Sequence, residues 1–219
     1  MISVIVPVYN EQQTIKGAVD QLLGSGGDIE VIVADGNGDS TISLLEENPR
    51  LKLCAAPKGR AGQMNAGAAL AAGETLLFLH ADTRLPEGAF EQIAQSGAVF
   101  GAFDLRIDSP RLVFRVIERA ASWRTRLTQI PYGDQAVFVR RELFERVGGF
   151  DAVPIMEDVM LAQKIKRLGF KPRIFKTPVL TSARRWEKEG IVYGTLRNWL
   201  LICAYFLGVH PDKLARLYK

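Results

Sequence analysis

The sequence has few cysteines and no apolar segment long enough to cross a membrane. Its two cysteines, Cys54 and Cys203, lie far apart in apolar surroundings, so they indicate reduced core residues in a reducing compartment, not a disulfide framework or a metal site. The most apolar stretch, 191–209, contains Arg197, and its uncharged part is too short to span a bilayer. We therefore expect this stretch to form a helix that packs on the domain or lies at an interface.

The sequence also lacks a strong excess of charge, a secretion signal, repeats and low-complexity linkers. A net charge of +4 and a pI of about 9.1 suit anionic small ligands or an anionic membrane surface, but they are too small to indicate nucleic-acid binding. The first residues carry no charged region or cleavage motif and have the pattern of a strand, which predicts a non-secreted, cytoplasmic protein. The 219 residues predict one domain, 1–219.

Short apolar runs alternate with helical patterns along the first half of the chain. The near-continuous apolar runs are typical of strands covered on both faces. Strands are expected at 2–8, 29–34, 51–55 and 75–79, and helices at 11–23, 40–46 and 61–72. This order predicts a parallel α/β sheet with right-handed crossovers.

The second half of the chain is less regular. Extended segments are expected at 99–107, 135–139, 172–175 and 179–185, and helices at 111–127, 141–147, 157–168 and 189–207. Together the two halves predict a mixed, mainly parallel sheet flanked by helices, with a C-terminal helical extension.

Polar side chains follow each of the first four predicted strands. They are Tyr9, Glu11, Asp35, Lys58, Arg60, His80 and Asp82. Because ligands bind beyond the carboxyl ends of strands in such sheets, these side chains predict one shared cleft. Asp35 sits where a carboxylate can accept hydrogen bonds from a base or ribose, whereas Asp39 or Ser40 in the same turn can cap the next helix.

Two of these strand ends suggest a site for a diphosphate. Lys58, Arg60 and Gln63 lie at a predicted helix start, which suits phosphate, although a solvated basic loop is the alternative. His80 and Asp82, two positions apart in an extended chain, project to the same side and can hold a divalent metal. The alternative for this pair is an exposed histidine beside an Asx turn.

Two further groups of side chains suit chemistry in the second half. Glu157 and Asp158 begin a predicted helix, where acids are commonly dipole partners, but one of them can act as a general base. Arg184, Arg185 and Trp186 close a predicted strand. They can bind phosphate and stack on a sugar, or they can be a structural arginine pair beside a buried tryptophan.

With these residues assembled, the sequence resembles the family-2 glycosyltransferases of the GT-A fold over nearly all its length. VIVPVYNE at 4–11, with Pro7 and Tyr9, resembles the family's opening strand and nucleotide-contact turn, and DGNGDST at 35–41 resembles its DGSxDxT segment. HAD at 80–82 occupies the place of the DxD metal motif. ED at 157–158 matches the pair whose aspartate is the catalytic base, and 182–186 is similar to QxxRW. The motifs LHADT at 79–83 and RRW at 184–186 also resemble those of a compact bacterial subgroup of this family.

The resemblance implies inverting transfer of a sugar from a nucleotide-diphospho-sugar to an acceptor hydroxyl. It implies a nucleotide-binding half at 1–97, an acceptor and catalytic half at 98–186, and a C-terminal helix and tail at 187–219. The residues implied for each role are as follows: Pro7, Tyr9, Glu11, Asp35, Lys58, Arg60 and Gln63 for the nucleotide; His80 and Asp82 for Mg²⁺ or Mn²⁺; Asp158, then Glu157, for the base; and Arg184, Arg185 and Trp186 for the diphosphate or acceptor. The last helix and the basic tail allow a lipid-linked acceptor and contact with the inner face of the membrane.

Three departures from the family pattern keep an alternative open. Ala34 replaces the first acid of an Asp pair, His80 replaces the first metal-motif aspartate, and Ser182 replaces the glutamine. The changes at positions 34 and 80 allow a nucleotide-sugar-binding protein with a disabled centre, whereas Ser182 argues against a processive polysaccharide synthase. A nucleotidyltransferase would carry a glycine-rich turn after the first strand, and residues 8–12 contain no glycine.

Overall fold

Four apolar runs form the parallel half of one sheet. The computed structural model describes residues 1–36 and 42–218. In it β1 (Ile2–Val8) lies between β2 (Ile29–Asp35) and β4 (Thr75–Phe78), and β3 (Leu51–Ala55) pairs with β2 at the edge. All four run in the same direction, so their carboxyl ends meet at one edge of the sheet, as the sequence predicted.

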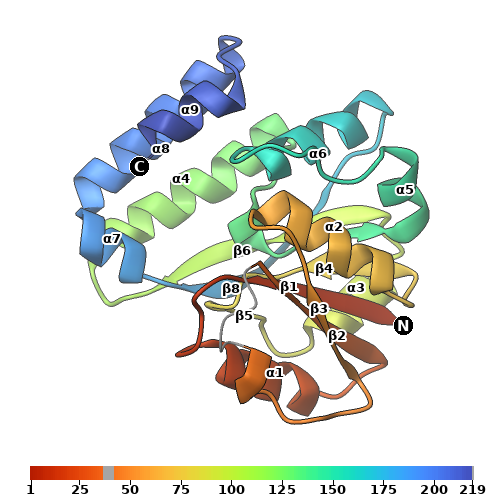
Figure 1. The fold of residues 1–219 in the computed structure, drawn as a ribbon. Coiled ribbons are helices and arrows are strands. Elements are labelled where there is room, and N and C mark those ends of the chain that lie inside the picture. Colours follow the sequence, from red (N-terminus) through yellow and green to blue (C-terminus); the bar gives the residue numbers. More distant parts are fainter. Residues whose placement is uncertain (37–41, 219) are drawn as a thin grey trace.

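The second half extends the same sheet with strands of both directions. β7 (Val137–Arg140) runs antiparallel to β4, and β6 (Phe100–Asp108) pairs antiparallel with β7. β8 (Arg173–Ser182) then lies parallel to β6, and β5 (Thr83–Arg84) pairs antiparallel with β8. The order is β3-β2-β1-β4-β7-β6-β8-β5. The predicted mixed, mainly parallel sheet is confirmed (Figure 1).

Helices cover both faces of the sheet because alternate strand residues bury apolar side chains on each. On one face Val4 and Val6 pack with α1 (Ile15–Gly24) and α3 (Ala89–Ser96). On the other face Ile5 and Phe78 pack with α2 (Arg60–Leu70), α5 (Arg141–Arg146) and α6 (Glu157–Arg167). The two apolar layers fix the sheet and therefore the loops at its edge.

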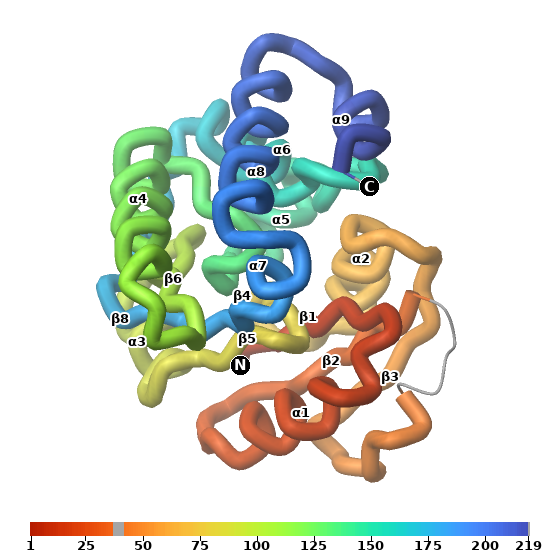
Figure 2. Tube along the Cα trace, turned by 90° about the vertical axis from the view of Figure 1, so that its left-hand side faces the viewer, coloured from red at the N-terminus to blue at the C-terminus, as the bar shows by residue number. Residues whose placement is uncertain are grey.

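A group of outer helices lies beyond β6 and β8. α4 (Leu112–Thr128) packs on β6, while α7 (Arg184–Glu189), α8 (Ile191–Phe206) and α9 (Pro211–Leu217) follow β8. Figure 2 shows α4 and α8 side by side on the same outer face. Among the described residues, no helix has the length and apolar character that a membrane span needs.

Several local predictions need correction. The helix predicted at 11–23 begins only at Ile15, and residues 184–186 begin helix α7 instead of closing a strand. The last long helix starts at Ile191, not at 189. The helix predicted at 40–46 falls partly outside the described residues, and a short 3₁₀ turn, η1 (Ile42–Leu44), is what the described part contains. β5, α3 and α9 were not predicted.

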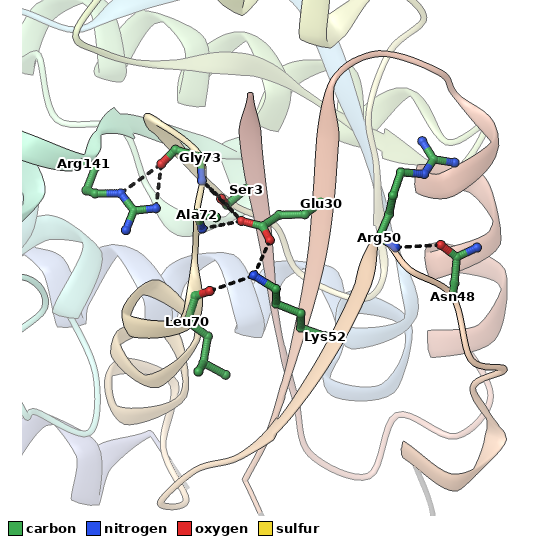
Figure 3. A network of polar contacts seen from close by, with 9 residues as sticks. All are labelled: Ser3, Glu30, Asn48, Arg50, Lys52, Leu70, Ala72, Gly73 and Arg141. Carbon is green, nitrogen blue, oxygen red and sulfur yellow. Dashed lines mark hydrogen bonds and ion pairs between the residues drawn. The ribbon is translucent and has the colours of Figure 1, made fainter.

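A buried carboxylate ties together the strand ends opposite the polar edge. Glu30 Oε1 accepts hydrogen bonds from the Ser3 hydroxyl at 2.6 Å and from the backbone N–H groups of Ala72 and Gly73, and Oε2 lies 2.7 Å from Lys52 Nζ (Figure 3). Burial opposes ionisation, but the Lys52 ammonium and these hydrogen bonds lower the pKa of Glu30 to about 2. One carboxylate therefore joins β1, β2, β3 and the segment before β4.

Replacing Glu30 with glutamine should destabilise the fold by about 2 kcal/mol, because buried donors lose a charged acceptor. The depressed pKa means that the stabilisation is present above the ordinary pKa and is lost as pH falls through about 2. Urea unfolding at pH 7 measures the difference, with Glu47→Gln, an exposed acid, as the control. Equal stability of the two variants would contradict this role.

Candidate active site

The polar edge of the sheet opens into a cavity of about 740 Å³. Twelve of the fourteen predicted site residues line it: Pro7, Tyr9, Glu11, Lys58, Arg60, Gln63, His80, Asp82, Glu157, Asp158, Arg185 and Trp186. Asp35 and Arg184 do not. Segments as far apart as β1 and α6 therefore contribute to one cavity, and Asp82 and Asp158 open onto it together.

One wall of the cavity carries Tyr9 and the basic residues before α2. The Lys58 ammonium donates to the Tyr9 hydroxyl at 2.9 Å and lies 4.3 Å from the centre of its ring. Arg60, the first residue of α2, is half-exposed, and its guanidinium lies 3.8 Å from Glu157. Two cations beside an exposed aromatic ring can bind a base and its phosphates.

Gln63 and Asp35 lie below this wall. The buried amide of Gln63 donates to the backbone carbonyls of Val8 at the end of β1 and Ala34 near the end of β2. Gln63 therefore holds two strand ends together as well as lining the cavity. Asp35 is fully buried, so the structure does not bring its side chain to the cavity surface with the other residues, and its contact with a nucleotide stays a prediction. Asp39 and Ser40 lie outside the described residues.

His80 and Asp82 follow β4 and both face the cavity. Burial, together with the charges of Arg60 and Arg185, lowers the pKa of His80 to about 3, so the imidazole is neutral and keeps a lone pair. The Asp82 carboxylate lies 3.6 Å from the Arg184 guanidinium, which is also 3.4 Å from Glu11. Within residues 1–36 and 42–218 no cluster of three or more histidine, cysteine or acidic side chains has metal-site geometry. His80 and Asp82 therefore supply only part of the ligands that a divalent ion would need.

Asp158 also lines the cavity, where backbone groups fix its carboxylate. Oδ2 accepts a hydrogen bond from Gly133 N–H, and Oδ1 accepts one from Val159 N–H at 2.8 Å. A Cβ added to Gly133 would lie 3.2 Å from His80 Nε2 and 3.3 Å from Asp158 Oδ2. Because residue 133 has no side chain, His80 and Asp158 can both lie close to its backbone.

The acids around Asp158 are poorly solvated. Burial and the neighbouring charge of Asp158 raise the pKa of Glu157 to about 7, although Arg60 opposes the shift. Burial also raises the pKa of Asp134, whose Oδ1 is buried without a hydrogen-bond partner among the described residues. Perturbed acids in a cavity are typical of an active site.

The outer helices contribute a further part of the cavity wall. Trp186 packs edge-on against Phe114 of α4, with the ring centres 5.8 Å apart, and also lines the cavity. Arg185 lies 4.5 Å and Arg197 4.8 Å from the centre of the Tyr218 ring. Trp186 is half-buried and has both a structural contact and a place in the cavity lining, so its stacking on a sugar stays a prediction.

Sequence reasoning missed part of the lining. The missed residues include Tyr132, Gly133, Asp134, Pro154, Asn198, Leu201 and Tyr218. The only signal for Gly133 and Asp134 was turn chemistry after Pro131, which says nothing about proximity to His80. Leu201 and Tyr218 lie on α8 and beyond α9, and their places depend on long-range packing.

Comparison with known proteins identifies the family of this chain. The sequence profile described as Glycosyl transferase family 2 matches residues 3–148, which is most of the chain, so the chain belongs to this family. A curated relative, probable glycosyltransferase YdaM from Bacillus subtilis (strain 168), is 25% identical over 220 residues, covering 86% of this chain and 50% of its own length. The chain therefore spans about half the length of this relative.

Solved structures share the fold. A mannosyltransferase, PcManGT from Pyrobaculum calidifontis, in complex with GDP-Man and Mn²⁺, has a TM-score of 0.60 and 28% identity, covering 83% of this chain and 56% of its own. TarS 1-349 from S. aureus has a TM-score of 0.64 and 18% identity, covering 83% of this chain and 60% of its own. These neighbours confirm the GT-A fold predicted from the sequence.

The raised pKa of Glu157 predicts a pH-dependent cost to the fold. Because its folded pKa exceeds its ordinary value of 4.5, its favourable contribution is full below 4.5 and is lost as pH rises through about 7. Glu157→Gln should therefore be more stable than the parent above pH 7, by about 2 kcal/mol, and similar to it near pH 4. Thermal unfolding across pH tests this, with the exposed Glu187→Gln as the control. A constant difference at all pH values would contradict the assignment.

Proposed function

We propose that the chain transfers a sugar from a nucleotide-diphospho-sugar to an acceptor hydroxyl with inversion at the anomeric carbon. One observation carries the proposal: His80, Asp82 and the backbone-held carboxylate of Asp158 line a single cavity, and His80 and Asp158 approach each other beside Gly133. Membership of glycosyl transferase family 2 supports the same activity.

In this proposal the half at 1–97 binds the donor. Tyr9 and Glu11 hold the base and ribose at the end of β1, with Asp35 beneath them, while Pro7 and Gln63 shape the wall. Lys58 and Arg60 balance the charge of the diphosphate, helped by the N-terminus of α2. The GDP-Man bound in the similar mannosyltransferase supports this class of donor without selecting the base.

The donor atoms at His80 and Asp82 fit a divalent ion that arrives with the donor. A neutral imidazole and one carboxylate face the cavity, and a small divalent ion commonly combines one or two protein carboxylates with substrate phosphates. When bound there, Mg²⁺ or Mn²⁺ would neutralise charge on the departing diphosphate. Mn²⁺ in the similar mannosyltransferase supports this cofactor class.

Asp158 is the proposed general base. Two backbone N–H groups hold its carboxylate in place at the cavity wall. It takes the proton of the acceptor hydroxyl as the acceptor oxygen bonds to the anomeric carbon and the nucleoside diphosphate leaves. Glu157, buried beside it, is the second choice for this role.

The acceptor side of the proposal comprises residues 98–186, closed by the helix and tail at 187–219. Arg185 and Trp186 face the cavity there, and Arg184 pairs with acids of the donor side. These side chains can orient the diphosphate or stack on a sugar.

A second candidate is a nucleotide-sugar-binding protein without transfer activity. It is favoured by His80 in the metal motif and by the pairing of Arg184 with Asp82. Metal-dependent donor hydrolysis by the purified chain would exclude this candidate.

The role of Asp158 as general base is tested by the variant Asp158→Asn. This variant should bind nucleotide-sugars as the parent does but turn them over roughly 100-fold more slowly or worse, because no group takes the proton. Release of nucleoside diphosphate measures turnover, and calorimetry measures donor binding. Asp20→Asn, an exposed acid on α1, is the control. Parental turnover in Asp158→Asn would reject the assignment.

The metal site is tested by Asp82→Asn. In a thermal-shift panel of nucleoside diphosphates, the parent should gain stability with one base in the presence of Mn²⁺, and the variant should lose most of the Mn²⁺-dependent part. Asp212→Asn, an exposed acid near the C-terminus, is the control. A variant that keeps the full Mn²⁺-dependent shift would show that Asp82 is not a ligand.

A further inference from the structure

The exposed apolar side chains of this chain are concentrated on two helices. Across residues 1–36 and 42–218, nineteen large apolar side chains are exposed, and eleven of them lie on α4 and α8. Scattered exposed apolar residues are ordinary, but a contiguous group marks an interaction surface.

The exposed side of α8 is apolar along its whole length. Its exposed residues follow helical spacing: Val192, Tyr193, Leu196, Trp199, Leu200 and Phe206. The opposite side is also apolar, since Leu201 is buried and Ile202 packs on the core of α2, α5 and α6. A helix that is apolar on all sides is normally covered on all sides, so the outer stripe requires a partner.

The exposed stripe of α4 continues this surface. It consists of Leu112, Val113, Val116, Trp123 and Leu127. Phe114 and Ile117 of α4 pack with Trp186 and Ile191 at the start of the C-terminal helices, which joins the two helices beneath the stripes. Figure 2 shows α4 and α8 on the same outer face of the molecule, and the two exposed stripes are here together called the α4–α8 face.

Cations outnumber acids around the α4–α8 face. α4 carries four arginines and one acid, Glu118; of these arginines Arg126 pairs with Asp104, while Arg197 of α8 is mostly buried and pairs with Glu189. The Glu118 carboxylate is engaged within the fold, because it accepts a hydrogen bond from Ile107 N–H and forms an ion pair with Arg115 at 3.0 Å. The exposed cations on these helices or near their ends are Arg111, Arg119, Lys188 and Arg216, and they outnumber the exposed acids Asp108 and Glu187 beside them. The partner should therefore be apolar within and anionic at its surface.

We propose that the α4–α8 face docks on an anionic lipid bilayer, with both helices lying in the interface. Tryptophan and tyrosine among leucines and valines, flanked by cations, is the composition of helices that lie in the headgroup region. The arginines can bury their aliphatic stems and leave the charge at the lipid phosphates. The face lies on the membrane and does not cross it.

Docking would bring the cavity close to the lipid surface. Asn198, Leu201 and Ile202 on the inner side of α8 line the cavity, while Trp199 and Leu200 point outward. One helix thus separates the cavity from the proposed bilayer. An acceptor held in the bilayer is a corollary that rests on the proposed transfer function, whereas docking itself does not.

Co-sedimentation with vesicles tests the docking. The parent should sediment with vesicles of phosphatidylcholine and phosphatidylglycerol, less with phosphatidylcholine alone, and less in high salt. Leu196→Ser with Leu200→Ser should weaken partition roughly tenfold or more, because two apolar side chains no longer enter the bilayer. A double control, Leu70→Ser with Leu168→Ser, removes two exposed leucines elsewhere (45% and 43% exposed, against 58% and 70% for Leu196 and Leu200) and should sediment as the parent does.

The variant with Leu196→Ser and Leu200→Ser, here the α8 variant, should bind nucleotides and unfold thermally as the parent does. This result would show that only docking is lost. Failure of the parent to sediment with the anionic vesicles, or equal sedimentation of the parent and the α8 variant, would overturn the proposal. Concentration-dependent dimers that the α8 variant abolishes, without vesicle binding by the parent, would assign the face to a second copy of this chain instead. Donor turnover is not a readout here, so these outcomes leave the proposed transfer function to its own tests.

Discussion

The antiparallel pairing of β7 with β4 is the contact on which the cavity depends. Phe78 near the end of β4 pairs with Val137 at the start of β7. Because the strands run in opposite directions, the chain entering β7 passes beside the chain leaving β4, which brings Gly133 against His80. Gly133 then donates to Asp158, so the same pairing anchors the start of α6. A parallel strand at this position would send these segments to opposite ends of the sheet.

The cavity keeps acids and cations close together at some cost to the fold. Glu157 is buried beside Asp158, and Arg60 offsets only part of the repulsion between them. The opposite end of the sheet has the reverse arrangement, where Glu30 meets Lys52 and a full set of donors. The fold thus places its satisfied carboxylate where it holds strands and its strained one where a ligand can enter.

Strand positions and the family could be predicted from the sequence because the signals are local. Apolar runs located β1 and β3, and the polar residues after each strand indicated the cavity edge. The helix at Arg184 was not foreseen, since it depends on the contact of Trp186 with Phe114 and on the Arg185–Glu189 pair within a short segment. Gly133, Asp134 and Tyr218 reach the cavity only through tertiary packing, so no local pattern marked them. Asp35 had a strong local signal, yet its side chain is fully buried.

Arg184 has a consequence for how the donor side can be loaded. Its guanidinium already stands between Glu11 and Asp82, so the two carboxylates have a positive neighbour supplied by α7. An ion arriving at Asp82 would meet this resident positive charge, and loading becomes an exchange of one cation for another. The proposed metal site at Asp82 would therefore lie beside a positive charge carried by the first residue of the short helix that leads into α8.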